Sequence, residues 1–370
     1  MSPFPWPEGA AFIMVSTPLS RLRRCLALAL FAGAAIVHIA PSAAAGPSGL
    51  PSLGALPALT GATTWLNSAP LTPAQLRGKV VLVDFWTYSC INCIRTLPHV
   101  RAWAEKYRSQ GLVVIGVHTP EFGFEKDAAN INKAIERFKI DYPIAVDSNH
   151  QIWNAFHNNA WPAFYLADTI GQIRARLSGE GNYEKTEKAI QALLAEAGRL
   201  QPMGALATPQ GSAEQAAPDI ANLRSGEAYV GYAQASNDVT RSGLKRDVAH
   251  DYTTTAPGLN QWGLSGNWTV GAEHANLNQP GGTIVYRFNA RDLHLVLRPR
   301  ADGKPVRFQV RINGSTPGKN HGADTDAQGN GSVTDTRLYQ LVRQAGGVRE
   351  STFEIRFLDA RVGAFAFTFG

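Results

Sequence analysis

The stretch Lys79–Cys93, KVVLVDFWTYSCINC, decides the fold of the first half of the chain. It begins with a continuous apolar run rich in β-branched residues, which is typical of a strand buried on both faces. The pair Cys90 and Cys93 follows, and residues 91–107 predict a helix. A C-x-x-C pair between a buried strand and a helix can bind zinc, form a structural disulfide or exchange electrons.

The third cysteine, Cys25, belongs to an N-terminal segment that has the form of a secretory signal. A basic cluster precedes the apolar stretch Cys25–Ala40, and Ala43-Ala44-Ala45 fits the A-x-A cleavage pattern. The stretch is shorter than a membrane-spanning helix requires. We therefore expect residues 1–45 to be a signal peptide, with an uncleaved N-terminal anchor as the alternative. Either reading predicts a periplasmic or otherwise extracytoplasmic bacterial protein.

Cleavage of that signal would leave Cys90 and Cys93 as the two cysteines of the exported chain. A tetrahedral zinc site needs four ligands, and the sequence offers no second cysteine or histidine cluster. A structural disulfide between residues three apart closes a very small loop and adds little stability. We therefore interpret the pair as a redox-active disulfide, and we expect no metal and no cofactor.

Length and composition favour two domains. The chain has 370 residues and a formal net charge of +6, and no Lys/Arg run follows Arg24, so the sequence does not indicate nucleic-acid binding. Residues 46–58 are predicted to be a tether and residues 199–221 a linker rich in Pro, Gly, Ala and Gln. Residues 59–198 alternate strands and helices in the order β-α-β-α-β-β-α, which predicts an α/β fold with a mixed central sheet flanked by helices.

Residues 222–370 have a different pattern. Short stretches such as VRFQVRI and STFEIRFL alternate apolar and polar side chains between turn residues. This pattern predicts an all-β sandwich of the jelly-roll type.

The position of the cysteines suggests how they would react. A helix N-terminus presents unpaired N–H groups and the positive end of the helix dipole, so Cys90 is expected to have a lowered pKa and to act as the nucleophile. Cys93 lies one turn further along and can attack a mixed disulfide from within. Asp84 interrupts the apolar strand six residues before Cys90. It is expected either to take the proton of Cys93 through a water, or to bond backbone at a strand end.

Two prolines complete the predicted site. Pro98 falls five residues after Cys93, within the helix, and is expected to kink it. Pro162 follows Trp161 at the start of the strand AFYLAD, where a cis peptide bond is expected. A cis proline there would present its neighbour's backbone to a substrate peptide and keep metals off the thiols.

These residues give the first domain a resemblance to the thioredoxin fold. The matching positions are Asp84, Trp86, Cys90, Cys93, Pro98 and Pro162. The stretches GKVVLVDFWTYSCINCIRTLPHV, GVHTPEFGFEK and NNAWPAFYLAD resemble the extracytoplasmic part of DipZ-type proteins, which are related to the ResA/TlpA thiol reductases. YVGYAQA, HGADTDAQGNG, RLYQLVRQ and the final FTFG are similar to the carbohydrate-binding-module-like domain that follows in those proteins.

The resemblance implies a thiol–disulfide oxidoreductase that acts on protein thiols or disulfides, with a link to cytochrome c maturation. DipZ-type proteins carry their own membrane electron conduit, so this chain would need a separate membrane donor of the DsbD/CcdA type. Because Ile-Asn stands between the cysteines, the resemblance does not predict the redox potential of the pair or the direction of electron flow. ResA-type proteins place an acid three residues after the second cysteine, where this chain has Thr96. Glu121 is expected either to replace that carboxylate or to be a plain helix N-terminal acid.

The second domain offers two further candidate sites. Exposed aromatic rings bind sugars in carbohydrate modules, so four rings are candidates for an envelope glycan, although large aromatics in sandwiches are more often core. They are Trp262, Trp268, Tyr229 and Tyr232. A calcium loop at Asp324, Asp326 and Asp335 is the weaker candidate, because the last position holds Asp rather than Glu and a solvated hairpin explains the spacing.

Three functions follow from these observations. The first is an exported protein-disulfide reductase. The second is an envelope glycan- or protein-binding module with an accessory redox domain. The third is a thiol peroxidase, for which Thr87 stands three residues before Cys90 but Val83 replaces the expected proline.

Overall fold

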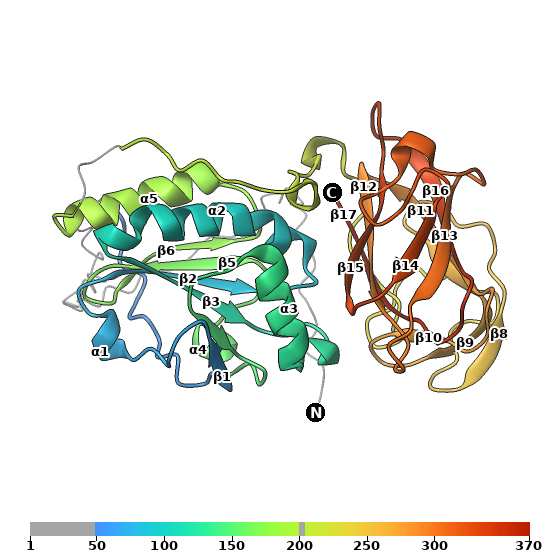
Figure 1. Ribbon diagram of the computed structural model, residues 1–370, viewed down its shortest axis with the longest axis horizontal. Coiled ribbons are helices and arrows are strands. Elements are labelled where there is room, and N and C mark those ends of the chain that lie inside the picture. Colours follow the sequence, from blue (N-terminus) through green and yellow to red (C-terminus); the bar gives the residue numbers. More distant parts are fainter. Residues whose placement is uncertain (1–48, 200–203) are drawn as a thin grey trace, which may run out of the picture. The chain divides into compact units, whose positions relative to one another are not determined.

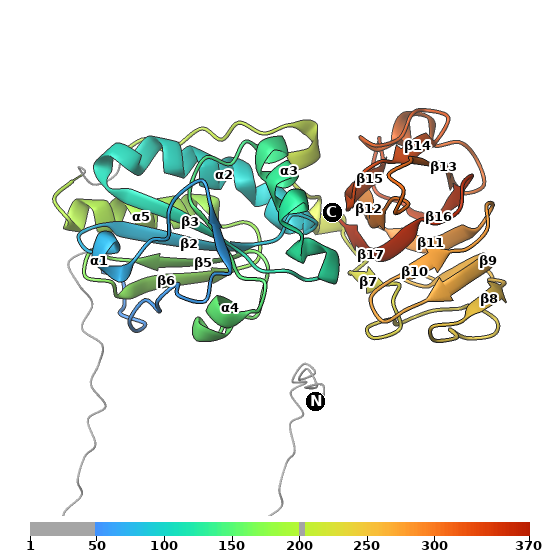
Figure 2. The ribbon, with the colours of Figure 1, turned by 60° about the horizontal axis from the view of Figure 1, so that its bottom comes forward.

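The computed structural model describes residues 49–199 and 204–370 (Figures 1 and 2). The predicted signal peptide, Cys25 and residues 200–203 of the predicted linker lie outside these ranges. Residues 49–199 are called the α/β half below, and residues 204–370 the β half. Within the described ranges, no helix is both long and apolar enough to cross a membrane.

The α/β half contains a mixed six-stranded sheet in the order β1-β4-β3-β2-β5-β6. Its strands are β1 (Thr64–Leu66), β2 (Val80–Trp86), β3 (Leu112–His118), β4 (Ile144–Val146), β5 (Ala163–Ala167) and β6 (Ile173–Ser178). The central strand β2 is buried along its whole length, parallel to β3 and antiparallel to β5. The sequence predicts such a mixed sheet, and the prediction is confirmed.

Helices cover both faces of this sheet (Figure 1). The helical segments are α1 (Pro73–Leu76), α2 (Ile91–Tyr107), α3 (Ala128–Phe138), α4 (Gln151–Ala155) and α5 (Tyr183–Glu196), with 3-10 turns η1 (Arg108–Gln110) and η2 (Gly123–Lys126). The apolar sides of α2, α3 and α5 share one core cluster with alternate residues of β2, whereas α1 and α4 pack on the other face. The helix with the cysteines is therefore fixed along the middle strand of the sheet.

The structure departs from the predicted elements where segments are short. The helix expected over residues 125–138 is divided into η2 and α3, because Asp127 accepts a hydrogen bond from the backbone of Ala129 and begins a new helix. The elements β1, β4, α1 and α4 have three to five residues each, too few for a periodic pattern. The described part of the predicted tether is packed, because Leu53 and Leu56 donate to backbone carbonyls at the start of β6.

The β half is built from antiparallel strand pairs. Its strands are β7 (Ala228–Tyr229), β8 (Ala249–Tyr252), β9 (Trp262–Val270), β10 (Ala275–Leu277), β11 (Thr283–Asn289), β12 (Asp292–Arg298), β13 (Val306–Ile312), β14 (Asn330–Val333), β15 (Arg337–Arg343), β16 (Glu350–Phe357) and β17 (Gly363–Phe369). Three 3-10 turns are η3 (Ala213–Gln215), η4 (Ile220–Asn222) and η5 (Gly318–Asn320). The all-β prediction is confirmed.

Strand β9 connects the two layers of the β half into one continuous path of strands. Its first residues pair with β11, and its last residues pair with β8 and β10. Gly266 lies between these two sections with a φ of +95°, a conformation that glycine adopts without steric cost. The strand can therefore turn from one layer to the other around a closed apolar core.

Candidate redox site

Cys90 and Cys93 lie at the first turn of α2. Cys90 is the N-cap residue, and its Sγ accepts a hydrogen bond from the backbone N–H of Cys93 at 3.2 Å. Both cysteines are free thiols in this structure. Cys90 is half-buried whereas Cys93 is only 1% exposed, so Cys90 is the sulfur that a protein substrate can reach.

Cys93 is a poor nucleophile until it loses its proton. Burial, the contact with Cys90 and the charge of Asp84 raise the pKa of Cys93 well above its usual value, against a smaller opposing effect of the Thr87 backbone. A base is therefore needed before Cys93 can attack a mixed disulfide.

Asp84 is placed to be that base. It lies in the middle of β2, pairs with Phe164 and Gly116 on the neighbouring strands, and is 1% exposed. Burial raises the pKa of Asp84 from 3.8 to about 8, and its Oδ1 has no hydrogen-bond partner among the described residues. Asp84 thus lies inside β2 rather than at its end, and its role as the base stays a prediction.

The other predicted positions surround the pair. Pro98 lies inside α2, which continues past it to Tyr107. The Trp161–Pro162 peptide bond is cis, as expected. The Trp161 indole donates to the Thr119 carbonyl at 3.1 Å. Trp86 is buried at the end of β2.

Glu125 is a site residue that sequence reasoning missed. It is fully buried, and its Oε1 accepts hydrogen bonds from the hydroxyls of Thr87 at 2.5 Å and Ser89 at 2.7 Å. Its Oε2 accepts from the backbone of Glu121 and Phe122. Burial raises the pKa of Glu125, although these donors oppose the shift. Glu125 thus holds the loop that leads into Cys90, and no capping motif marks it in the sequence, because Phe122 at the start of η2 has no side-chain acceptor.

Glu121 does not take the place of the ResA-type acid beside the cysteines. Its carboxylate accepts from the hydroxyl of Tyr229 at 2.5 Å, and the same hydroxyl lies 2.9 Å from Glu227. A phenol has one proton and can donate to one carboxylate, so the second contact requires a protonated carboxyl group. Burial and mutual repulsion raise the pKa of Glu121, and burial raises that of Glu227.

This shared proton predicts how the stability of the protein depends on pH. A carboxyl group whose folded-state pKa lies above its unfolded value stabilises the fold below the unfolded value, and loses that contribution as pH rises through the folded value. The contribution of the Glu121–Glu227 pair to the free energy of unfolding should therefore fall as pH rises from 5 to 8. Glu121→Gln should reduce that fall by about 1 kcal/mol in denaturant titrations, because one acid no longer competes for the proton.

The matched control is Glu105→Gln on the exposed side of α2, which should keep the wild-type pH dependence. A wild-type slope in Glu121→Gln would show that the three groups do not share a proton.

The two histidines near the cysteine pair pack against aromatic rings. His118 is fully buried, stacks on Tyr88 and meets the edge of Trp86, and burial lowers its pKa to about 3. His99 stacks on Tyr183 with ring centroids 3.6 Å apart, and burial lowers its pKa as well. Both therefore act as packing groups at neutral pH.

The β half contributes side chains to the walls around the redox helix. Phe365 of β17 packs against Phe124 and Phe122, with ring centroids 4.6 and 5.4 Å apart. Val296 and Leu338 belong to the same apolar cluster as the residues that follow Cys93. The redox pair thus lies beside a surface that both halves build.

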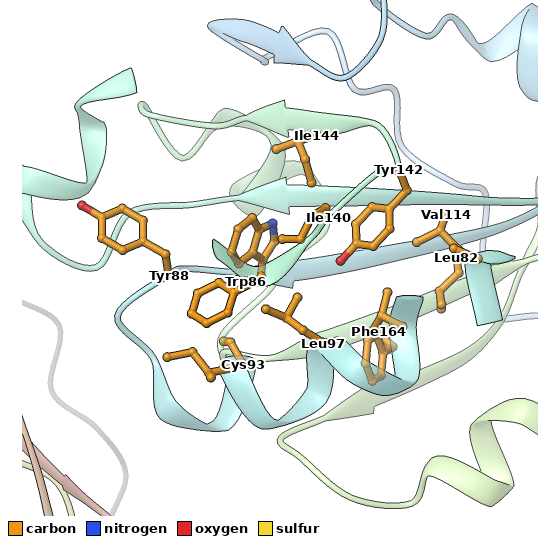
Figure 3. Packing of buried hydrophobic residues seen from close by; sticks show 14 of the residues in the cluster. Leu82, Trp86, Tyr88, Cys93, Leu97, Val114, Ile140, Tyr142, Ile144 and Phe164 are labelled. Carbon is orange, nitrogen blue, oxygen red and sulfur yellow. The ribbon is translucent and has the colours of Figure 1, made fainter. Parts of the chain in front are cut away.

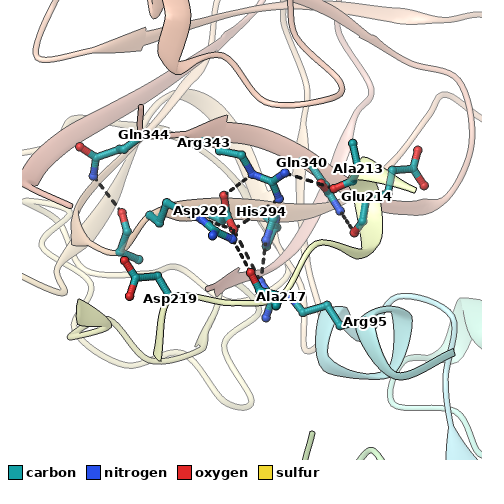
Figure 4. A network of polar contacts seen from close by, with 12 residues as sticks. Arg95, Ala213, Glu214, Ala217, Asp219, Asp292, His294, Gln340, Arg343 and Gln344 are labelled. Carbon is teal, nitrogen blue, oxygen red and sulfur yellow. Dashed lines mark hydrogen bonds and ion pairs between the residues drawn. The ribbon is translucent and has the colours of Figure 1, made fainter. Parts of the chain in front are cut away.

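A buried charge cluster joins α2 to β12 (Figure 4). Arg95, two residues after Cys93, contacts Glu180 at 3.1 Å, Asp292 at 4.0 Å and the Nε2 of His294 at 3.5 Å. Asp292 also binds Arg291 at 2.6 Å and Arg343 at 2.7 Å. Burial alone would raise the pKa of Asp292, but the arginine hydrogen bonds outweigh it and hold the pKa below its usual value.

The proposed glycan-binding aromatics need correction. Trp262 and Trp268 are fully buried in the core of the β half, and their indoles donate to backbone carbonyls, so neither offers a face to a sugar. Tyr229 is half-buried, and its hydroxyl donates to Glu121. The guanidinium carbon of Arg246 lies over the ring of Tyr232, 5.0 Å from the ring centroid. The four rings do not form one binding surface.

The acids of the proposed calcium loop have separate partners. Asp324 binds Arg337 at 2.6 Å, Asp326 accepts from the backbone of Asn330, and Asp335 pairs with Lys133 at 2.9 Å. Within residues 49–199 and 204–370, no group of His, Cys, Asp or Glu residues is arranged to hold a metal.

Each half of the chain matches the model of a known protein family. The family model described as "Thioredoxin like C-terminal domain" matches residues 225–370, and the AhpC/TSA family model matches residues 56–176. Protein DipZ of Mycobacterium tuberculosis is 37% identical over 276 residues, which are 72% of this chain and 39% of DipZ. The chain therefore spans about two fifths of the length of that relative.

Two further proteins match the α/β half. The thiol-disulfide oxidoreductase YkuV of Bacillus subtilis is 37% identical over 142 residues, 38% of this chain and 95% of YkuV. The solution structure of an oxidised thioredoxin-like protein, 36% identical, covers 39% of this chain and 96% of its own, with a TM-score of 0.36. Because YkuV is 37% identical to this chain along 95% of its own length, the chain belongs to the thioredoxin-like family of thiol–disulfide oxidoreductases.

Proposed function

We propose that the protein is an exported reductase of protein disulfides that acts through Cys90 and Cys93. The observation that carries the proposal is the arrangement of three groups. The Sγ of half-buried Cys90 caps the helix, and the backbone N–H of buried Cys93 donates to it. The buried Asp84 carboxylate, whose Oδ1 has no hydrogen-bond partner among the described residues, acts on Cys93 through its charge. These are the nucleophile, the resolving thiol and the base of a dithiol exchange.

The reaction proceeds in two exchanges. The thiolate of Cys90 attacks one sulfur of a substrate disulfide, which forms a mixed disulfide and releases the first substrate thiolate. Asp84 then takes the proton of Cys93, and the Cys93 thiolate attacks Cys90 Sγ. The Cys90–Cys93 bond forms, the second substrate thiolate leaves, and two electrons have passed from the enzyme to the substrate.

Reduction of the Cys90–Cys93 disulfide would restore the enzyme. We propose a separate membrane donor of the DsbD/CcdA type for this step. The extracytoplasmic location and a place in cytochrome c maturation belong to the same proposal, and they rest on the signal-like N-terminus and the resemblance to ResA- and DipZ-type proteins. The likeness to the thiol-disulfide oxidoreductases YkuV and ResA supports protein thiols and disulfides as the substrates.

The midpoint potential of the pair tests the direction of electron flow. We expect a value near about −270 mV, as in thioredoxin, when the full chain is equilibrated with glutathione or dithiothreitol buffers at pH 7. A Cys25→Ser background removes the third thiol from the titration. A midpoint near about −120 mV would make the protein an oxidant and contradict the proposal.

The AhpC/TSA match leaves a peroxidase to be tested beside the reductase. The same preparation should reduce insulin disulfides and should leave hydrogen peroxide unconsumed above a Cys90→Ser blank. Peroxide consumption that depends on Cys90 would favour the peroxidase.

A further inference from the structure

Three buried polar atoms near Asp84 have no hydrogen-bond partner among the described residues. They are Asp84 Oδ1, the indole nitrogen of Trp86 and the hydroxyl of Tyr142. Each of these side chains is at most 2% exposed. Buried polar groups nearly always have a partner, so three unpartnered ones in one region indicate a shared polar site.

Gly116 makes room for these atoms to meet. In the parallel β2–β3 ladder Gly116 pairs with Asp84, so a side chain at Gly116 would project on the same face as the carboxylate. A Cβ at Gly116 would lie 2.5 Å from Ile144 Cδ1, 2.9 Å from Trp86 Nε1 and 3.2 Å from Tyr142 Cε2, the ring carbon next to the hydroxyl-bearing carbon. The Ile144 methyl, the indole and the phenol therefore occupy the slot beside Asp84 that any other residue would fill.

The directions of the two rings agree with this geometry. Figure 3 shows the indole nitrogen of Trp86 and the hydroxyl of Tyr142 turned toward each other, above Cys93 and Leu97 of α2 in this view. Tyr142 lies just before β4, and its hydroxyl points into the core rather than toward solvent. The charge of Asp84 is the largest contribution after burial to the raised pKa of Tyr142, so the two groups interact.

We propose that Tyr142 is a positioning residue for the proton transfer from Cys93, acting through a water molecule that its hydroxyl, the Trp86 N–H and the Asp84 carboxylate hold together. A buried water needs two to four polar partners, and these groups supply three. The hydroxyl and the indole N–H donate to the water, and the water donates to the carboxylate. That hydrogen bond stabilises the ionised form of Asp84, which is the form that accepts the proton of Cys93. The inference rests on the proposed dithiol exchange.

The other ionisable groups around Asp84 do not supply this effect. Among the described residues, burial raises the pKa of Asp84, and the charge of Asp84 acts on Cys93 and on Tyr142. Cys93 is the proton donor of the reaction. His118, two residues beyond Gly116 in β3, stays neutral because burial lowers its pKa to about 3. Arg101 and Asp141 act on Tyr142 rather than on Asp84.

The test is the titration of Asp84 in the reduced full chain with Tyr142→Phe. The change removes one oxygen and keeps the ring that fills the slot. The midpoint of the Asp84 ¹³Cγ titration should rise by about one pH unit, because a hydrogen bond that favours the ionised form is lost. The pH profile of the rate at which Cys93 resolves a mixed disulfide should shift upward by the same amount. At pH 7 the variant should therefore resolve at about one tenth of the wild-type rate.

Tyr165→Phe is the matched control. Tyr165 is also buried, but it lies on the opposite face of the same sheet, where its hydroxyl bonds Phe156 and Asn158. It should leave both profiles unchanged. An unchanged or lowered Asp84 midpoint in Tyr142→Phe would overturn the inference, whereas failure of the proposed function would appear as absence of Cys90-dependent exchange in the wild type.

A second variant keeps the test decisive if Tyr142→Phe does not fold. Incorporation of 3-fluorotyrosine at position 142 leaves the hydroxyl in place and makes it a stronger donor. The Asp84 midpoint should then move down, opposite to the phenylalanine variant. A midpoint that stays or rises with the fluorinated side chain would also overturn the inference.

Discussion

Cys93→Ser should turn the protein into a trap that holds its substrates as mixed disulfides through Cys90. Cys90 is half-buried and still able to attack, but the buried sulfur that would release the substrate is gone. Cys90→Ser should lower insulin reduction by more than about a thousandfold, because residues that act as one catalytic unit lose nearly all activity together. Both variants are best made on a Cys25→Ser background, so that no other thiol can respond.

The readout separates the two cysteines. Non-reducing electrophoresis of Cys93→Ser after incubation with a disulfide substrate should show a covalent complex that dithiothreitol dissolves. Cys90→Ser and the double variant should show none. A complex formed equally well by Cys90→Ser would assign the nucleophile to Cys93 and contradict the site described above.

The second large effect is expected at Asp292. Asp292→Asn should lower the free energy of unfolding by about 3–5 kcal/mol, because it leaves the surrounding arginines without their buried counter-charge. Asp292 is fully buried between Arg291 and Arg343, and Arg95 approaches it from α2. Guanidinium unfolding of the full chain measures the loss.

Asp302→Asn is the control for that measurement. Asp302 pairs with Arg300 at 2.7 Å but is exposed, so its loss should destabilise the protein far less than the loss of Asp292. Equal small losses in the two variants would show that the Asp292 cluster contributes no more than a surface ion pair.

The local sequence pattern predicts the strand and the helix that position the cysteines. The buried strand β2 and the helix α2 are long, and the C-x-x-C pair stands at the boundary between them, so residues close in sequence determine their geometry. Asp84 could be identified because a single carboxylate interrupts an apolar run. The cis bond before Pro162 was expected for a similar local reason.

Other parts of the site depend on contacts between segments far apart in sequence. Glu125 serves the loop before Cys90 only because η2 folds beneath it, and Glu121 faces away because Tyr229 of the β half meets it. Whether Trp262 and Trp268 face the core or the solvent could not be decided from sequence, because an aromatic residue in an alternating strand gives the same pattern in both cases. The role of Gly116 depends on Tyr142, which is 26 residues away and reaches the slot only in the folded sheet.

The ring of Phe365 contacts the rings of Phe122 and Phe124, and these contacts limit where the chain can be divided. A cut within residues 199–221 would follow the domain boundary that the sequence indicates, yet it would expose Phe122, Phe124 and Ile94 at the rim of the redox pair. It would also leave Arg95 without Asp292. The contacts that hold the redox helix and the neighbouring η2 turn therefore extend across the linker, and a fragment that ends in the linker would lose them.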